Sequence, residues 1–95
     1  MIGLMFRQRM GRDTCMLFIF PKEAKQGIWM RNMRFPIDIM WLDSSKRVVD
    51  FVETATPASR RIYAPEKEAK YVLETNAGFI KRNRIKKGVA IRTAL

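Results

Sequence analysis

Several polar side chains stand inside otherwise apolar stretches of the sequence, where they could form a small site. The set comprises one aromatic residue, two amides and three acids: Trp29, Asn32, Asp38, Glu53, Glu74 and Asn76. Convergent polar groups beside a flat aromatic wall are what a small-ligand site needs. Two carboxyl groups could also do acid–base work if one is protonated and the other is not. The plainer interpretation is that these side chains satisfy backbone groups at strand ends.

A second candidate site is the basic C-terminal part of the chain. No acid occurs after Glu74, and six cations follow it: Lys81, Arg82, Arg84, Lys86, Lys87 and Arg92. The five cations within 81–87 could attract the phosphate backbone of RNA or DNA. The other basic residues that could extend this patch are Arg7, Arg9, Arg12, Arg60 and Arg61. A charged face also keeps a protein soluble without any partner, so charge alone does not establish binding.

Composition excludes several kinds of chemistry. The 95 residues include 19 Lys plus Arg and 9 Asp plus Glu, for a formal net charge of +10. There is no His and only one Cys, so Ser-His-Asp and Cys-His arrangements and an intrachain disulfide are impossible. The usual zinc ligands are missing, and the seven Met residues suit core packing better than a copper site. We therefore expect no metal and no cofactor.

The sequence shows no segment that predicts membrane insertion or export. It has no run of 18 apolar residues, and residues 1–12 lack a charged head followed by an apolar stretch. The lone Cys15 suits a reducing compartment. We therefore expect a cytoplasmic protein.

Hydrophobic patterning predicts one domain, 1–95, that is mainly β. The predicted strands cover residues 14–20, 28–31, 36–42, 47–55, 69–75 and 89–95, and one short helix covers 77–85 with Asn76 as its cap. The clearest feature is an antiparallel hairpin, 36–42 with 47–55, around a polar turn at 43–46. Strand 36–42 is apolar on both faces past Asp38 and should be central. Strands that do not alternate with long helices favour a compact antiparallel sandwich or barrel-like fold.

The hairpin register bears on the polar set. If Leu42 pairs near Val48, Asp38 lies opposite Val52 or Glu53. Two carboxyl groups would then lie at the same end of the hairpin. A long loop at 56–68 carries two prolines and little periodicity, which is typical of a functional or mobile connection.

Several segments in one order and spacing carry a family resemblance. They are residues 3–7 (GLMFR), 16–20 (MLFIF), 29–32 (WMRN), 36–39 (PIDI), 71–74 (YVLE) and 76–78 (NAG). From Gly3 onward the chain resembles the prokaryotic domain of unknown function family 192. It departs from the family pattern at Cys15, Met33 and Val89, where Gly, Thr and Asp are usual. The resemblance implies a compact, mainly β domain of sandwich or barrel type, and no established activity, cofactor or catalytic residue.

The resemblance also bears on the N-terminus. Family members usually carry a strand and a short helix before the segment that begins at Gly3, whereas only Met1 and Ile2 precede it here. An uncovered sheet edge invites pairing with another chain. We therefore expect a homodimer, or swapped contacts, in which residues 1–6 take part.

Three hypotheses of function follow, in order of preference. The first is a non-catalytic domain that binds a small ligand in a cleft around Trp29, Asn32, Asp38, Glu74 and Asn76, with Glu53 nearby. The second is a basic accessory protein that binds RNA or DNA through residues 81–87. The third is an enzyme that uses Asp38 with Glu53 or Glu74. Convergent side chains in a dry cleft would favour the first or third, and a contiguous basic face the second.

Overall fold

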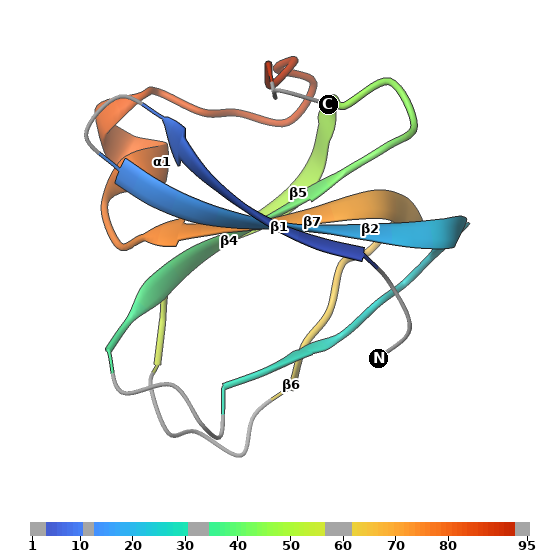
Figure 1. The fold of residues 1–95 in the computed structure, drawn as a ribbon, viewed down its shortest axis with the longest axis horizontal. Coiled ribbons are helices and arrows are strands. Elements are labelled where there is room, and N and C mark those ends of the chain that lie inside the picture. The colour runs from blue at the N-terminus through green and yellow to red at the C-terminus, as the bar shows by residue number, and fades with distance from the viewer. Residues whose placement is uncertain (1–3, 11–12, 31–34, 57–61, 93–95) are drawn as a thin grey trace.

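Within residues 4–10, 13–30, 35–56 and 62–92, the computed structural model has seven strands and one short helix. Side chains are described from Cys15 onward, except that of Trp29. The fold is mainly antiparallel β-sheet, as the patterning predicts (Figure 1).

Five strands form the main sheet, in the order β1-β2-β7-β4-β5. Their bounds are β1 Leu4–Met10, β2 Asp13–Ala24, β7 Ala69–Asn76, β4 Ile37–Leu42 and β5 Val48–Ala55. Every neighbouring pair is antiparallel. The order places β1 at one edge of the sheet and β4 inside it, and all six residues of β4 are buried.

The predicted hairpin is confirmed as β4 and β5. Leu42 pairs with Val48, and the turn is closed by Asp43, whose Oδ1 accepts hydrogen bonds from the backbone N–H groups of Ser45 and Arg47. An irregularity in the ladder falls between Ile37 and Ile39, so Asp38 lies opposite the 53–54 stretch of β5. The register argument for Asp38 and Glu53 therefore holds to within one residue.

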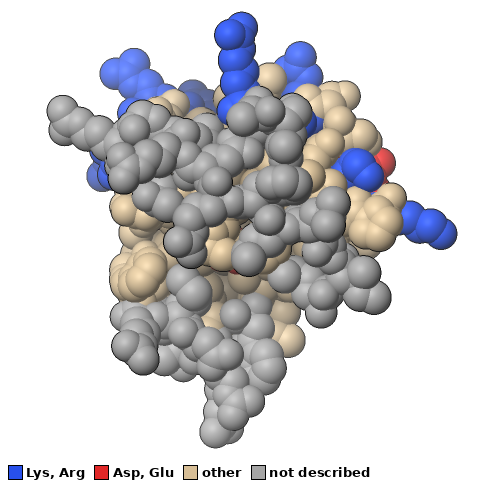
Figure 2. Space-filling view, in the orientation of Figure 1, with Lys and Arg blue, Asp and Glu red and all other residues tan. Residues whose placement is uncertain are grey.

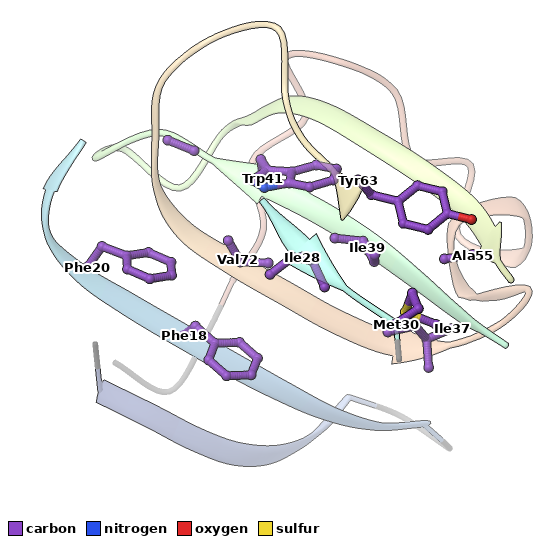
Figure 3. Close-up of a cluster of buried hydrophobic side chains, with 11 residues drawn as sticks. Phe18, Phe20, Ile28, Met30, Ile37, Ile39, Trp41, Ala55, Tyr63 and Val72 are labelled. Atoms are coloured by element: carbon purple, nitrogen blue, oxygen red, sulfur yellow. The ribbon is translucent and has the colours of Figure 1, made fainter. Parts of the chain in front are cut away.

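One face of the main sheet, the ribbon face, is covered by a small two-stranded ribbon. The ribbon pairs β3 Ile28–Trp29 with β6 Ile62–Tyr63. Large apolar side chains fill the space between the sheet and its cover, and Figure 3 shows their arrangement. They include Phe18, Phe20, Ile28, Met30, Ile37, Ile39, Trp41, Tyr63 and Val72. The indole N–H of Trp41 donates to the carbonyl of Gln26 at 2.8 Å, so its one polar group is satisfied.

The opposite face, the helix face, is covered by α1 Phe79–Arg82 and the segment that follows it (Figure 1). We call residues 79–92 the basic segment. Its buried apolar side chains pack on Leu17, Met40, Leu42 and Leu73 of the sheet. They are Phe79, Ile80, Ile85 and Ile91. Buried apolar and exposed charged residues alternate irregularly along this segment, which is why it lies flat on the sheet rather than extending from it.

Three strand predictions needed correction. β1 was not predicted, because residues 4–10 mix apolar and basic types without a continuous apolar run. β2 continues past Pro21 to Ala24, with an irregular register between Ile19 and Ala24 that accommodates the proline. β6 lies inside the stretch predicted to be a loop, because a two-residue strand leaves no periodicity to detect.

The C-terminal predictions were also too regular. The helix has one turn, Phe79–Arg82, rather than the predicted 77–85, and its N-cap is Gly78 rather than Asn76, which ends β7. Gly78 precedes the helix with φ +97° and Arg84 follows it with φ +52°, and both conformations are left-handed. The predicted strand at 89–95 is wrong for the described residues, where only Ala90 makes a single bridge, to Arg47. Residues 88–91 instead exchange backbone hydrogen bonds with Lys46 and Val48 while Ile91 packs on the helix face.

Candidate functional site

The carboxylate of Asp38 is completely buried and fully used by the backbone. Its Oδ1 accepts a hydrogen bond from the N–H of Thr54 at 2.8 Å. Its Oδ2 accepts from the N–H of Gly78 at 3.1 Å and from the N–H of Ile80 at 2.9 Å. Asp38 has no exposed surface. These donors are backbone groups of β5 and of the start of α1, which is the arrangement that the plainer interpretation predicts.

Glu74 lies on the other face of the sheet from Asp38. It pairs with Met16 of β2 and Ile39 of β4, both of which face the ribbon. Asp38 pairs with Thr75 and contacts the start of α1 on the helix face. Because successive residues of a strand point to opposite faces, the two carboxyl groups do not converge. The structure therefore does not assemble the predicted pair of acids into one catalytic site.

Glu74 nevertheless has an unusual environment. It is half-buried, and within the described residues its carboxyl group has no hydrogen-bond or ion-pair partner. Burial disfavours the charged form and raises the pKa of Glu74 from 4.5 to about 7. This carboxyl group therefore holds its proton up to a higher pH than a solvated glutamate does.

The remaining residues of the predicted cleft are dispersed. Glu53 is exposed on β5, and Asn76 is exposed at the end of β7. Trp29 belongs to β3 of the covering ribbon, but its side chain lies outside the described part, as does the whole of Asn32. Glu74 and Asn76 are two residues apart on β7, so both side chains point to the ribbon face. Asp38 points to the other face and does not join them.

The basic segment brings its cations together on one end of the molecule. All six of its predicted cations are exposed, whereas Phe79, Ile80, Ile85 and Ile91 of the same segment are buried. In Figure 2 most of the Lys and Arg atoms in view lie along the upper half, where Figure 1 places α1 and the C-terminal end. The side chains of Arg7 and Arg9, and all of Arg12, Arg60 and Arg61, lie outside the described part, so their predicted contribution stays a prediction.

The turn between β4 and β5 adds basic residues that the sequence analysis missed. The guanidinium of Arg47 donates to the carbonyl of Gly88 at 3.0 Å, and the N–H of Ile91 donates to the carbonyl of Lys46 at 2.9 Å. Lys46 and Arg47 therefore lie directly against the basic segment. No local sequence pattern predicts this contact, because it joins a hairpin turn to a segment some 40 residues later.

Acidic residues border the basic segment on one side. Nζ of Lys87 lies 3.9 Å from Asp50 and 4.0 Å from Glu66. The Lys87 side chain is more than half exposed, so these pairs are weak and screened by salt. A surface depression lies here, and its lining includes Arg47, Lys67 and Lys87.

Two further features concern the described residues as a whole. They contain no cluster of three Cys, Asp or Glu side chains that could hold a metal ion. No helix in the same part of the chain has the length and apolar character needed to span a membrane.

Comparison with curated proteins finds relatives of uncharacterised function. The chain is 38% identical over 78 residues to UPF0127 protein TK1120 of Thermococcus kodakarensis, covering 80% of this chain and 48% of that protein. It is 40% identical over 75 residues to UPF0127 protein PYRAB11210 of Pyrococcus abyssi, covering 77% and 62%. The matched part of the chain thus spans about half to three fifths of these relatives.

Two crystal structures have a similar fold. One, from Sinorhizobium meliloti, is called "a putative transcription regulator"; it has a TM-score of 0.77 at 36% identity, covering 90% of this chain and 67% of that one. The other, a protein of unknown function from Novosphingobium aromaticivorans, has a TM-score of 0.76 at 32% identity, covering 90% and 61%. A family model described as "Uncharacterized ACR, COG1430" matches residues 1–93. Since that match spans nearly the whole chain, the protein belongs to the DUF192 family.

Proposed function

We propose that the protein binds nucleic acid through the phosphate backbone, with the basic segment as its contact surface. One observation carries the proposal: every cation of the basic segment is exposed, and the segment itself contains no acid. The segment is also held in place on the sheet. Phosphate neutralisation by Lys and Arg releases counterions and supplies most of the affinity of non-specific binding. A fixed array of cations attracts a polyanion more effectively than the same charges on a disordered tail, because less ordering entropy is lost.

Three further points support this surface. Lys46 and Arg47 extend it from the neighbouring turn. The net charge of +10 adds long-range attraction to any nucleic acid. The S. meliloti structure named for transcription regulation is 36% identical to this chain, which is consistent with a nucleic-acid partner.

The geometry favours duplex over unpaired bases. Phe79, which could have stacked on a base, is only 4% exposed and packs into the helix face. Single-strand binding depends on exposed aromatic side chains beside the cations. The ring of Tyr71 lies 5.7 Å from Nζ of Lys46, but it is only partly exposed and packs against the helix-face core. We therefore expect backbone contacts that carry no base specificity.

Fluorescence anisotropy with a short labelled duplex at low salt tests the proposal. If about five phosphates are neutralised, the logarithm of the affinity should fall with the logarithm of salt at a slope of about −4.5. Changing Lys81, Arg82, Arg84, Lys86 and Lys87 to Gln should flatten that slope. Absence of binding at low salt, where electrostatic attraction is strongest, would overturn the proposal.

A matched pair of variants separates this surface from net charge. Lys81→Gln with Arg84→Gln removes two cations from the basic segment. Lys22→Gln with Lys25→Gln removes two exposed cations at the end of β2 and just after it. The first pair should weaken binding and lower the slope by about 2, whereas the second should change binding little. Equal losses in both pairs would show that overall charge, and not this surface, attracts the nucleic acid.

Glu74 supports a second candidate function, retention of a small ligand at the ribbon face. The supporting observation is a half-buried carboxyl group without a described partner, whose pKa burial raises to about 7. A ligand with a cationic or hydrogen-bond-donating group would supply the missing partner. Native mass spectrometry of protein purified from its own cells should then show an added mass that Glu74→Gln loses. A spectrum with the bare chain alone would remove this candidate.

A further inference from the structure

The start of the basic segment is held by one side chain that lies about 40 residues earlier in the sequence. α1 has no side-chain cap of its own, because its N-cap residue is Gly78. The carboxylate of Asp38 takes that place by accepting the N–H groups of Gly78 and Ile80. The first N–H groups of a helix have no hydrogen-bond acceptor within the helix. Here a carboxylate that is distant in the sequence is their acceptor.

The same carboxylate also holds a second unfavourable backbone position. Thr54 has φ +53°, a left-handed conformation that a β-branched residue rarely adopts, and its N–H donates to Oδ1 of Asp38. Gly78 is left-handed as well, with φ +97°. One buried carboxylate therefore fixes two left-handed residues, one in β5 and one at the entrance to α1.

The other end of the basic segment is attached differently. Two of its bonds to the start of β5 are between backbone atoms: the N–H of Gly88 to the carbonyl of Val48 at 2.7 Å, and the N–H of Val48 to the carbonyl of Val89 at 2.9 Å. The guanidinium of Arg47 adds a side-chain hydrogen bond to the carbonyl of Gly88 at 3.0 Å, so this end does not depend on one side chain alone. The entrance at Gly78 is thus the place where one substitution can loosen the segment.

From this geometry we infer that Asp38 is a positioning residue for nucleic-acid binding: its carboxylate fixes the basic segment against the sheet and so sets the affinity of the cations it does not touch. The inference rests on the proposed function for its binding readout. For the change in duplex affinity, it also predicts the opposite sign to the one that net charge alone predicts. Removing a negative charge from a protein should strengthen its attraction to nucleic acid. Loosening the segment should weaken it.

Asp38→Asn is the first test, because it keeps the shape of the side chain while losing the charge and putting an NH₂ donor in place of one of the two accepting oxygens. We expect duplex affinity to fall by about tenfold, the size of a typical coupling between sites. Hydrogen exchange across residues 79–92 should rise by a similar factor. The control is Glu23→Gln, which removes one exposed negative charge on β2 and should leave both readouts unchanged or strengthen binding slightly.

Chemical rescue sharpens the test. Asp38→Ala leaves three buried N–H groups facing a space where a carboxylate was, and formate can accept from them. Added formate, compared with chloride at equal ionic strength, should restore exchange protection and affinity in Asp38→Ala and change neither in the wild type. If either variant folds poorly, Thr54→Gly provides a background in which the left-handed residue no longer has a Cβ.

Two results would overturn the inference. One is a duplex affinity of Asp38→Asn that equals or exceeds that of the wild type, as charge alone predicts. The other is unchanged exchange protection over 79–92 in both Asp38 variants. If the wild type binds no duplex, the proposed function fails together with the affinity part of the inference, and hydrogen exchange still decides whether Asp38 holds the segment.

Discussion

The two faces of the main sheet are closed in different ways. The ribbon face is sealed by large side chains, with Trp41, Phe20 and Met30 each at most 1% exposed. The helix face is covered by a one-turn helix and an irregular segment, attached through backbone hydrogen bonds and the carboxylate of Asp38. The residues that stabilise the fold and the residues that carry the exposed positive charge therefore lie in different places. The ribbon face holds the large aromatic core, and the outer side of the opposite cover carries the cations.

Truncation of the ribbon-face core should have the largest effect. Trp41 is fully buried and donates a hydrogen bond to Gln26. Trp41→Ala should lower the free energy of unfolding by about 4 kcal/mol, the usual cost of deleting a buried aromatic side chain. Urea denaturation followed by circular dichroism measures it. Phe35→Ala is the control, because Phe35 is 57% exposed and should lose less than about 0.5 kcal/mol.

A matched pair of isoleucines compares the two faces directly. Ile39 is completely buried in β4 toward the ribbon face, and Ile80 is 3% exposed in the helix-face cover. Ile39→Ala should cost about 4 kcal/mol and Ile80→Ala about 2 kcal/mol, because a cover with only one turn of helix can settle into the space that is left. The same denaturation curves give both numbers. Equal losses would show that the packing at the two faces is equally rigid.

The sequence was most informative where contacts are local. β4 and β5 were predictable because an apolar run, a polar turn and a second β-rich run follow one another, and the turn residue Asp43 closes them as expected. β7 was predictable from its own alternation. β3 and β6 were not paired in advance, because each has two residues and a long stretch of chain separates them.

The candidate site was less predictable than the fold. Which cations belong to the basic segment could be read from composition, but their neighbours Lys46 and Arg47 depend on a long-range contact. The role of Asp38 depends on N–H groups at Thr54 and Gly78 that the sequence does not mark. Alternation within β4 and β7 separates Asp38 from Glu74, but this follows only once the pairing register of the two strands is known.

Glu74 gives the ribbon face a pH dependence of a defined sign. Burial raises its pKa from 4.5 to about 7, so the folded chain holds the proton more tightly than the unfolded chain. The contribution of Glu74 to the free energy of unfolding therefore falls as the pH rises from about 4.5 to about 7, and is constant above that range. Glu74→Gln cannot titrate, so it should be more stable than the wild type at about pH 8 by on the order of 2 kcal/mol.

Denaturation of both proteins at several pH values between about 4 and 8 measures this difference. The stability gap between Glu74→Gln and the wild type should open across that window and stay constant above it. A gap that does not change with pH would mean that the carboxyl group is solvated in the folded protein, and would also remove the support for a ligand at the ribbon face.

The smallest expected effects come from two glycines, one in each cover. Substituting either one should destabilise the fold, but for different reasons. Gly88 in the basic segment has φ +93°, and a Cβ there would meet no atom within 4 Å. Gly88→Ala should therefore cost about 1 kcal/mol through its backbone conformation alone. Gly27, just before β3, has no such φ, but a Cβ there would come within 2.5 Å of Cγ2 of Ile62. Gly27→Ala should also cost about 1 kcal/mol, through a steric clash.

A second substitution separates the two mechanisms. Ile62→Ala removes the atom that the Cβ of Gly27→Ala would strike, and Ile62 itself is 63% exposed, so its truncation alone should cost little. Combining Gly27→Ala with Ile62→Ala should recover most of the stability that Gly27→Ala loses. The recovery appears as a coupling energy in a double-mutant cycle. Combining Ile62→Ala with Gly88→Ala should give additive losses, because no side chain opposes a Cβ at 88. Recovery in the second combination would mean that the basic segment is coupled to the ribbon across the sheet, and that the two covers are not independent.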